Sequence, residues 1–166
     1  MPITLSELNQ MDQEHFTQTL GAIFEHTPAI ARQTWPQRPF SNIEALHHSM
    51  VAVMQTLPTE EKLRLIRAHP DLGTKAKMAD ASVQEQASVG LDQLSAEEFA
   101  MFETLNQTYR DRFQFPFIVA VKEHNQHSIL EAFRQRLTHD FETERRTALT
   151  EIAKIAGYRL AALIVT

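Results

Sequence analysis

The sequence of 166 residues contains no cysteine. This absence excludes disulfide bridges, thiolate nucleophiles and zinc sites with cysteine ligands. Glycine is also scarce, with 4 residues in the chain, whereas hairpins and barrels use glycine at their turns. The scarcity favours helices joined by connections rich in proline, serine, threonine and aspartate.

The chain also lacks a long apolar run and an excess of positive charge. No stretch reaches the length of a membrane span, the N-terminus has no signal-peptide pattern, and Leu163–Thr166 does not match the peroxisomal tripeptide. We therefore expect a cytoplasmic protein with no membrane partner. Lys and Arg number 16 against 21 Asp and Glu, a net charge of -5. Because phosphate backbones are bound by clustered positive charge, nucleic acid is not an expected partner.

What is present is the composition of an ordinary globule, 43% hydrophobic and 22% charged. We expect a single domain over residues 1–166. Apolar residues recur at three- and four-residue steps, which is typical of amphipathic helices. The pattern predicts helices near residues 12–25, 42–56, 59–68, 96–113, 129–137 and 148–160. The expected fold class is all-α, a single compact multi-helix bundle.

A hydroxyl residue followed three positions later by glutamate recurs along the chain. This capping-box pattern marks the N-terminus of a helix, because the hydroxyl accepts from a free backbone N–H and the glutamate bonds back to the cap. The copies begin at Thr4, Ser41, Ser82, Ser95 and Ser128. Each predicts the start of a helix.

Three segments do not follow the helical period. Residues 69–80 are polar and contain Pro70 and Gly73, so they predict a loop. Phe115–Val121 is almost wholly apolar, and periodicity alone leaves a buried strand and a buried helical turn equally open. Trp35–Phe40 holds the one tryptophan and two prolines; we interpret it as a packed corner in which Arg38 is structural.

His69 closes a helix that carries basic residues, and Pro70 ends that helix. A helix C-terminus favours a charged imidazole, which raises the pKa of the histidine and suits it to acid catalysis near neutral pH. A C-capping histidine without chemistry is the simpler interpretation of this position taken alone.

The run Ser82–Gln86 places a hydroxyl, a carboxylate and an amide within one helical turn, beside backbone N–H groups that suit an anion. The same pattern occurs elsewhere as an ordinary cap.

Arg159 lies beside an apolar stripe; its guanidinium either extends to water or sits at a pocket edge, where it suits a carboxylate. His124 and His127 have metal-ligand spacing but supply only two ligands, so no metal is expected.

Five segments taken together resemble a known family. They occur in order along most of the chain: Trp35–Phe40, His69–Leu72, Ser82–Leu91, Leu105–Phe117 and Glu151–Leu160. Each motif alone is weak, but the ordered set resembles the 2-oxo-4-hydroxy-4-carboxy-5-ureidoimidazoline (OHCU) decarboxylases.

The resemblance implies a compact all-helical enzyme that converts OHCU to (S)-allantoin in urate breakdown, a carboxy-lyase without cofactor or metal. Its partner is a small anionic ureidoimidazoline, and the resemblance is compatible with a homodimer. His69 and Glu85 match the catalytic positions. Substrate-binding positions are matched by Pro70, Ser82, Val83, Gln84, Glu85, Gln86, Phe117, Ile118, Val119, Ala120, Val121 and Arg159.

We hypothesise that His69, coupled to Glu85, handles the proton of the substrate's 4-hydroxyl group. Arg159 and the amides near Ser82 would hold the anion, and Phe117–Val121 (the wall segment) would offer an apolar wall with backbone groups. The loop before Ser82 is shorter than in animal relatives, which affects the mouth of the pocket.

The alternative to an enzyme is a binding module, because His69-Pro70-Asp71 is also the tripeptide of J-domain co-chaperones.

Overall fold

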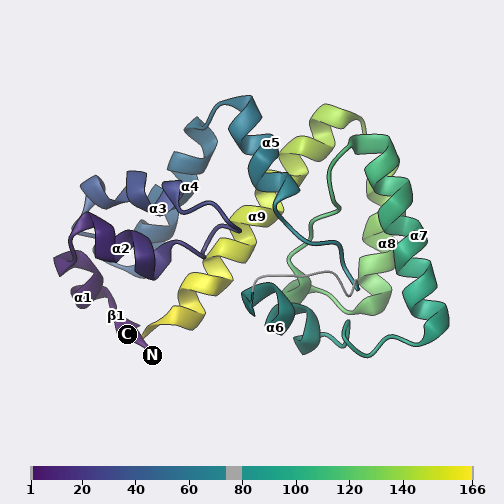
Figure 1. Cartoon of the computed structure of the whole chain (residues 1–166), viewed down its shortest axis with the longest axis horizontal. Helices are drawn as coiled ribbons and strands as arrows, with labels where there is room; N and C mark the ends of the chain where they lie inside the picture. The colour runs from purple at the N-terminus through teal and green to yellow at the C-terminus, as the bar shows by residue number, and fades with distance from the viewer. Residues whose placement is uncertain (1, 74–79, 166) are drawn as a thin grey trace. The chain divides into compact units, whose positions relative to one another are not determined.

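The structure, a computed structural model, describes residues 2–73 and 80–165, without the side chains of residues 80–82. Helices dominate these residues, so the all-α prediction is confirmed (Figure 1). The chain divides into two compact units: Met1–Leu65 with Ala153–Thr166 (unit 1), and Ile66–Ile152 (unit 2). The single domain expected from the sequence stays a prediction.

Unit 1 contains the N-terminal helices and a short parallel sheet. Ile3 pairs with Ile164 and Thr4 with Val165, so the two ends of the chain meet in this sheet (Figure 1). Its elements are β1 (Ile3–Thr4), α1 (Leu5–Gln10), α2 (Gln13–Leu20), α3 (Ala29–Thr34), the 3-10 helix η1 (Trp35–Gln37), α4 (Ile43–Thr56), most of α5 (Thr59–Arg67), the end of α9 (Phe141–Leu163) and β2 (Ile164–Val165).

The tryptophan corner of unit 1 is packed as predicted. The indole Nε1 of Trp35 donates to the carbonyl of Met11 at 2.9 Å. The guanidinium of Arg38 lies 3.8 Å from the centre of the Trp35 ring and donates to the carbonyl of Asn9 at 3.2 Å. Arg38 is therefore structural, because stacking and hydrogen bonding fix it against the corner.

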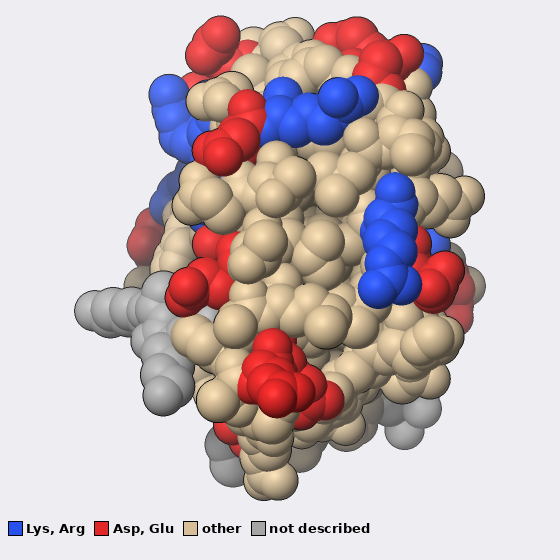
Figure 2. Space-filling view, turned by 90° about the vertical axis from the view of Figure 1, so that its right-hand side faces the viewer, with Lys and Arg blue, Asp and Glu red and all other residues tan. Residues whose placement is uncertain are grey.

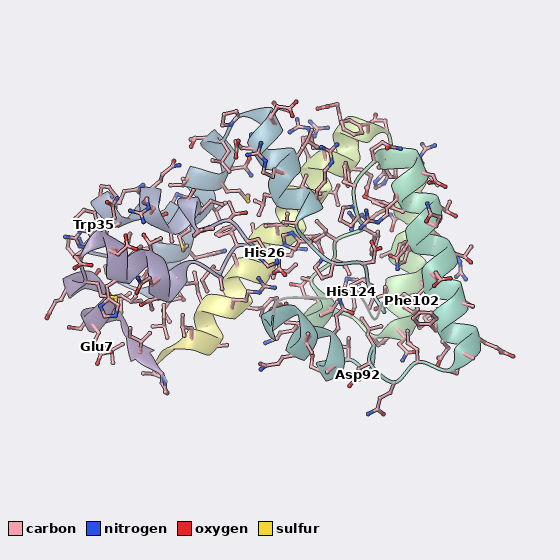
Figure 3. The ribbon with its side chains drawn as sticks, viewed as in Figure 1. Glu7, His26, Trp35, Asp92, Phe102 and His124 are labelled. Atoms are coloured by element: carbon pink, nitrogen blue, oxygen red, sulfur yellow. The ribbon has the colours of Figure 1, made fainter. Side chains whose placement is uncertain are left out.

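Unit 2 contains α6 (Asp80–Ser88), α7 (Ala96–Phe113), the 3-10 helix η2 (Val121–Glu123), α8 (Gln126–Arg136) and the first part of α9. Its core is aromatic. The ring of Phe117 stacks on that of Phe133 with centroids 3.8 Å apart. Phe102 points from α7 to α8, where its ring meets Phe133 edge-on at 6.3 Å (Figure 3). These contacts hold α7 beside α8 (Figure 1).

Two of the predicted capping boxes are confirmed, at Thr4 and at Ser95. The box predicted at Ser41 is wrong, because the neighbouring Asn42 caps α4 and accepts from the N–H of Ala45. Asparagine is at least as good a cap as serine, and the adjacent position fits the helix start.

The other two boxes are also corrected. Ser128 is not the cap of α8; Asn125 is, and Ser128 is its partner three residues on. Ser82 lies inside α6, which already includes Asp80, so Ser82 is not an N-cap. The first helix expected over 12–25 ends at Leu20, where Gly21, a poor helix former, follows.

Charges of both signs lie interspersed on the face drawn in Figure 2, and no broad field of either sign covers its described residues. Exposed pairs such as Arg134 with Glu131, at 2.9 Å, contribute about 0–1 kcal/mol each. Within the described part of the chain, every helix is too short or too polar to cross a membrane.

Asp140 caps α9 and supplies a test of the fold through pH. Its carboxylate accepts from the N–H of Thr143 at 2.7 Å, and this hydrogen bond lowers the pKa of Asp140 below its ordinary value. A lowered pKa in the folded state stabilises the protein above the unfolded pKa, and the stabilisation is lost as pH falls through the folded value. At pH 7, Asp140→Ala is therefore expected to lower the melting temperature, and the difference from wild type should vanish at low pH.

Asp140→Asn is the matched control, because asparagine caps the helix without titrating. Thermal unfolding followed by circular dichroism, from pH 7 down to a pH below the lowered pKa of Asp140, measures all three proteins. The Asn variant should keep its advantage over the Ala variant across the whole range. Equal melting temperatures for wild type and Asp140→Ala at pH 7 would contradict the cap.

Candidate active site

His69 lies in unit 2, two residues after the end of α5. Helix α5 ends at Arg67, and the N–H of His69 donates to the carbonyl of Ile66 at 3.2 Å. The His69 side chain is buried, with 6% of the residue exposed. Pro70 then prevents continuation of the helix, so the chain leaves α5 in a fixed direction through His69–Gly73, which we call the His69 loop.

Gln86 of α6 ties this loop in place. Its Oε1 accepts from the N–H of Gly73 at 3.1 Å, and its Nε2 donates to the carbonyl of Asp71 at 3.4 Å. Gly73 has a φ of +67°, and a Cβ atom there would lie 2.8 Å from Leu94. Only glycine fits this turn without strain, and the Gln86 side chain supplies the partner that its buried N–H needs.

Two side chains of α7 hold the same loop from another side. Asn106 donates through Nδ2 to the carbonyl of Leu72 at 2.8 Å. Arg110 donates through Nε to both carboxylate oxygens of Asp71, at 2.9 and 3.1 Å. The backbone that carries His69 is thus fixed by side chains from two helices.

A cavity of about 80 Å³ lies between the His69 loop and α7. Its lining includes Asp71, Gly73, Asn106 and Arg110, and it does not include His69. The Oδ1 atom of Asn106 is buried and has no hydrogen-bond partner among the described residues. The cavity is therefore a polar space behind the loop and separate from the candidate catalytic histidine.

The predicted Ser82–Gln86 run is spread around helix α6. Val83 and Gln84 are exposed, Glu85 is half-buried and Gln86 is buried. The side chain of Ser82 lies outside the described residues, as do residues 74–79 of the preceding loop, whose length we expected to affect the pocket mouth. Of the described members, Glu85 and Gln86 face the protein.

The wall segment is buried along its whole length and is neither the strand nor the helical turn left open by its sequence. It is irregular backbone that enters η2 at Val121. Two buried side chains fix it: Arg136 of α8 donates through Nη1 to the carbonyl of Ile118, and Glu151 of α9 accepts from the N–H of Ala120 at 3.0 Å. Side chains here replace the ladder of a strand.

Some backbone groups of the wall segment stay unpaired. The N–H of Ile118 and both the N–H and C=O of Val119 have no hydrogen-bond partner within the residues described, although these residues are only 3% and 5% exposed. Buried backbone groups are almost always paired. These groups are available to a ligand with planar amide donors and acceptors. Helix α6 packs against η2, next to this segment.

Arg136 is part of a buried network. Its Nε donates to Oε1 of Glu144 at 2.8 Å, and the hydroxyl of Tyr109 donates to the same oxygen. His139 Nδ1 lies 2.8 Å from the other carboxylate oxygen. Burial raises the pKa of Tyr109 far above its ordinary value, so the phenol stays protonated as a donor.

Arg159 belongs to unit 1, and its guanidinium is buried instead of extending to water. Nη1 donates to Oε2 of Glu25 at 2.9 Å, to the carbonyl of Ala22 at 3.2 Å and to that of Ile23 at 3.5 Å. The arginine is 8% exposed and Glu25 is 1% exposed. A carboxylate and two carbonyls therefore fix the orientation of this side chain.

His124 and His127, the two histidines with metal-ligand spacing, do not form a metal site among the described residues. His124 Nδ1 lies 2.9 Å from the hydroxyl of Ser128, at the cap of α8 (Figure 3). His127 is exposed. No group of three His, Asp or Glu side chains able to hold a metal occurs among the described residues.

Sequence reasoning did not single out Arg136 or Asn106. Arg136 follows Arg134 at the charged end of a helix and was easily taken as solvated, yet it lies three positions after the buried Phe133, on the apolar face. Asn106 likewise lies on the apolar face of α7, four positions after the buried Phe102 and three before the buried Tyr109. A polar residue on an apolar helix face was the signal available in both cases.

Gln86→Leu tests the link between α6 and the His69 loop. The substitution leaves the buried N–H of Gly73 unpaired, which is expected to lower the free energy of unfolding by about 1–3 kcal/mol. Gln84→Leu, on the exposed side of the same helix, should change it by less than about 0.5 kcal/mol. Urea unfolding measures both variants, and equal stabilities would show that the Gln86 bonds do not hold the loop.

Comparison with known proteins adds family information to this geometry. The family model described as OHCU decarboxylase matches residues 9–161. The chain is 44% identical to the 2-oxo-4-hydroxy-4-carboxy-5-ureidoimidazoline decarboxylase of Halalkalicoccus jeotgali, over 98% of this chain and 93% of the relative. It is 46% identical to the uric acid degradation bifunctional protein PucL of Bacillus subtilis, over 97% of this chain and 33% of that protein.

Among solved structures, a crystal structure of (S)-allantoin synthase superposes with a TM-score of 0.82 at 30% identity, covering 99% of this chain. The present chain spans 55% of that longer chain. The comparisons give no support to the co-chaperone alternative. The match over residues 9–161 and the identity to a full-length relative lead to one conclusion: the chain belongs to the OHCU decarboxylase family.

Proposed function

We propose that the protein decarboxylates OHCU to (S)-allantoin in the breakdown of urate. The observation that carries the proposal is the family match over residues 9–161, which spans every candidate site residue. The names of the relatives point to the same step: one is a decarboxylase of this compound and one a bifunctional protein of uric acid degradation. The structurally similar protein is an (S)-allantoin synthase.

The reaction needs little from the protein beyond orientation and proton transfer. The bond between the ring carbon and the carboxylate breaks as CO2 leaves, and its electron pair forms a double bond to the carbon that carries the ureido group. The former imine electrons go to the ring nitrogen, which takes up a proton from solvent. The 4-hydroxyl group then loses its proton to become a carbonyl, and a proton is delivered to the carbon that carries the ureido group. Because the substrate contains its own electron acceptor, no cofactor is required as an electron sink.

We assign the proton of the 4-hydroxyl group to His69, coupled to Glu85. The support is that the His69 loop is held in place by Gln86, which follows Glu85 on α6. General acid–base catalysis requires a fixed donor or acceptor within reach of the reacting proton. The buried position of His69 and the hydrogen bonds that hold its loop support the first part of that requirement, a fixed group.

The remaining proposed contacts bind the substrate. The unpaired backbone groups of Ile118 and Val119 suit the flat ureido group and ring amides. Arg159 is assigned to the carboxylate, which its planar guanidinium fits. Pro70 and the Ser82–Gln86 run are the other proposed substrate-binding residues, and the support for them is the family resemblance.

A homodimer and a cytoplasmic location also belong to the proposal. Sedimentation velocity of the purified chain tests the first, and fractionation of the source cells tests the second.

The decisive assay adds purified protein to OHCU generated freshly from urate and follows the circular dichroism of the allantoin formed. We expect rapid formation of a single enantiomer. His69→Asn should lower kcat by about 100-fold or more, the contribution typical of a general acid or base. His127→Asn, an exposed histidine of the same chain, serves as the matched control and should keep wild-type turnover.

Two results would count against the proposal. Slow racemic allantoin at the background rate with the wild-type protein would refute the substrate assignment. Full activity of His69→Asn, with the product still one enantiomer, would leave the reaction in place but remove His69 from its centre.

A further inference from the structure

The wall segment has a shape that no secondary structure imposes, so something else must determine where its unpaired groups point. Its backbone is held at the carbonyl of Ile118 by Arg136 and at the N–H of Ala120 by Glu151. The unpaired N–H and C=O of Val119 lie between these two points. A shift at either point would turn the peptide planes of Ile118 and Val119.

Arg136 is itself fixed on every side. Glu144, which is fully buried, accepts from its Nε at 2.8 Å. The guanidinium carbon lies 4.3 Å from the centre of the Phe117 ring, within the same wall segment. Tyr109 and His139 bond to the Glu144 carboxylate. The guanidinium fork can therefore reach Glu144 and Ile118 at once, which a lysine ammonium at the same position cannot reproduce.

We infer that Arg136, oriented by Glu144, is a positioning residue for substrate binding: it holds the Ile118 carbonyl so that the free backbone groups of Ile118 and Val119 face the substrate. The inference rests on the proposed function. It adds to that function a pair of residues that lie behind the wall segment, on α8 and α9, and that make no proposed contact with the reacting atoms.

The inference predicts which kinetic constant changes. The ureido and ring amide groups that the wall segment would bind keep their hydrogen bonds while CO2 leaves. Losing such uniform binding raises KM and leaves kcat nearly unchanged. A purely structural role would instead lower the fraction of folded protein, and with it the apparent kcat, while KM stayed constant.

Arg136→Lys is the test, with Arg134→Lys as its matched control on the exposed side of α8, where Arg134 pairs with Glu131 at the surface. We expect Arg136→Lys to raise KM for OHCU about tenfold, the effect of one or two lost hydrogen bonds, with kcat within about threefold of wild type. The dissociation constant of (S)-allantoin, measured by titration calorimetry, should rise by a similar factor. Arg134→Lys should change neither constant.

Tyr109→Phe provides a second variant that leaves no unpaired charge. It removes the hydroxyl that holds Glu144 and should raise KM by a smaller factor in the same direction; it decides the question if Arg136→Lys does not fold. If the wild-type enzyme is active and Arg136→Lys folds with an unchanged KM, the inference is overturned. If only Tyr109→Phe folds, an unchanged KM in that variant overturns it. An inactive wild type that does not bind (S)-allantoin would overturn the proposed function as well.

Discussion

The buried salt bridge between Arg136 and Glu144 is the constraint on which unit 2 most depends. Removing two charges from water is costly, and mutual attraction offsets that cost only where the remaining donors and acceptors are also paired. Here they are paired with Ile118, Tyr109 and His139. Removing one partner would leave a buried group unsatisfied, so α7, α8, the first part of α9 and the wall segment are fixed with respect to one another within unit 2.

The same principle explains how an all-helical unit presents irregular backbone in its interior. Among the residues that the structure describes, no strand lies beside the His69 loop or the wall segment, so their buried N–H and C=O groups need other partners. Helix side chains supply them: Gln86 and Asn106 for the loop, Arg136 and Glu151 for the wall segment. Rigid helices thus hold the two non-helical segments to which we assign the chemistry.

The sequence predicted the helices well because their period is local, and it predicted the His69 loop because a proline that follows a helical stretch prevents its continuation. Cap positions were less certain: Asn42 and Asn125 compete with the nearby Ser41 and Ser128, and the choice depends on where tertiary packing starts the helix. The wall segment could not be predicted, because its conformation is set by partners far along the chain. Glu151 lies 31 residues from Ala120, and no local pattern carries that pairing.

The pairing of Arg159 with Glu25 bears on how a carboxylate could be bound and then lost. Under the proposed function Arg159 binds the carboxylate that leaves as CO2. An uncompensated guanidinium would stabilise the anionic ground state, whereas decarboxylation moves the charge from the carboxylate to the ring. Glu25, at 2.9 Å and nearly fully buried, reduces the net charge that the substrate meets while it fixes the direction of the arginine's hydrogen bonds. Such a pair orients the substrate carboxylate but stabilises its anionic ground state less than a lone arginine would. The smaller stabilisation favours release of neutral CO2.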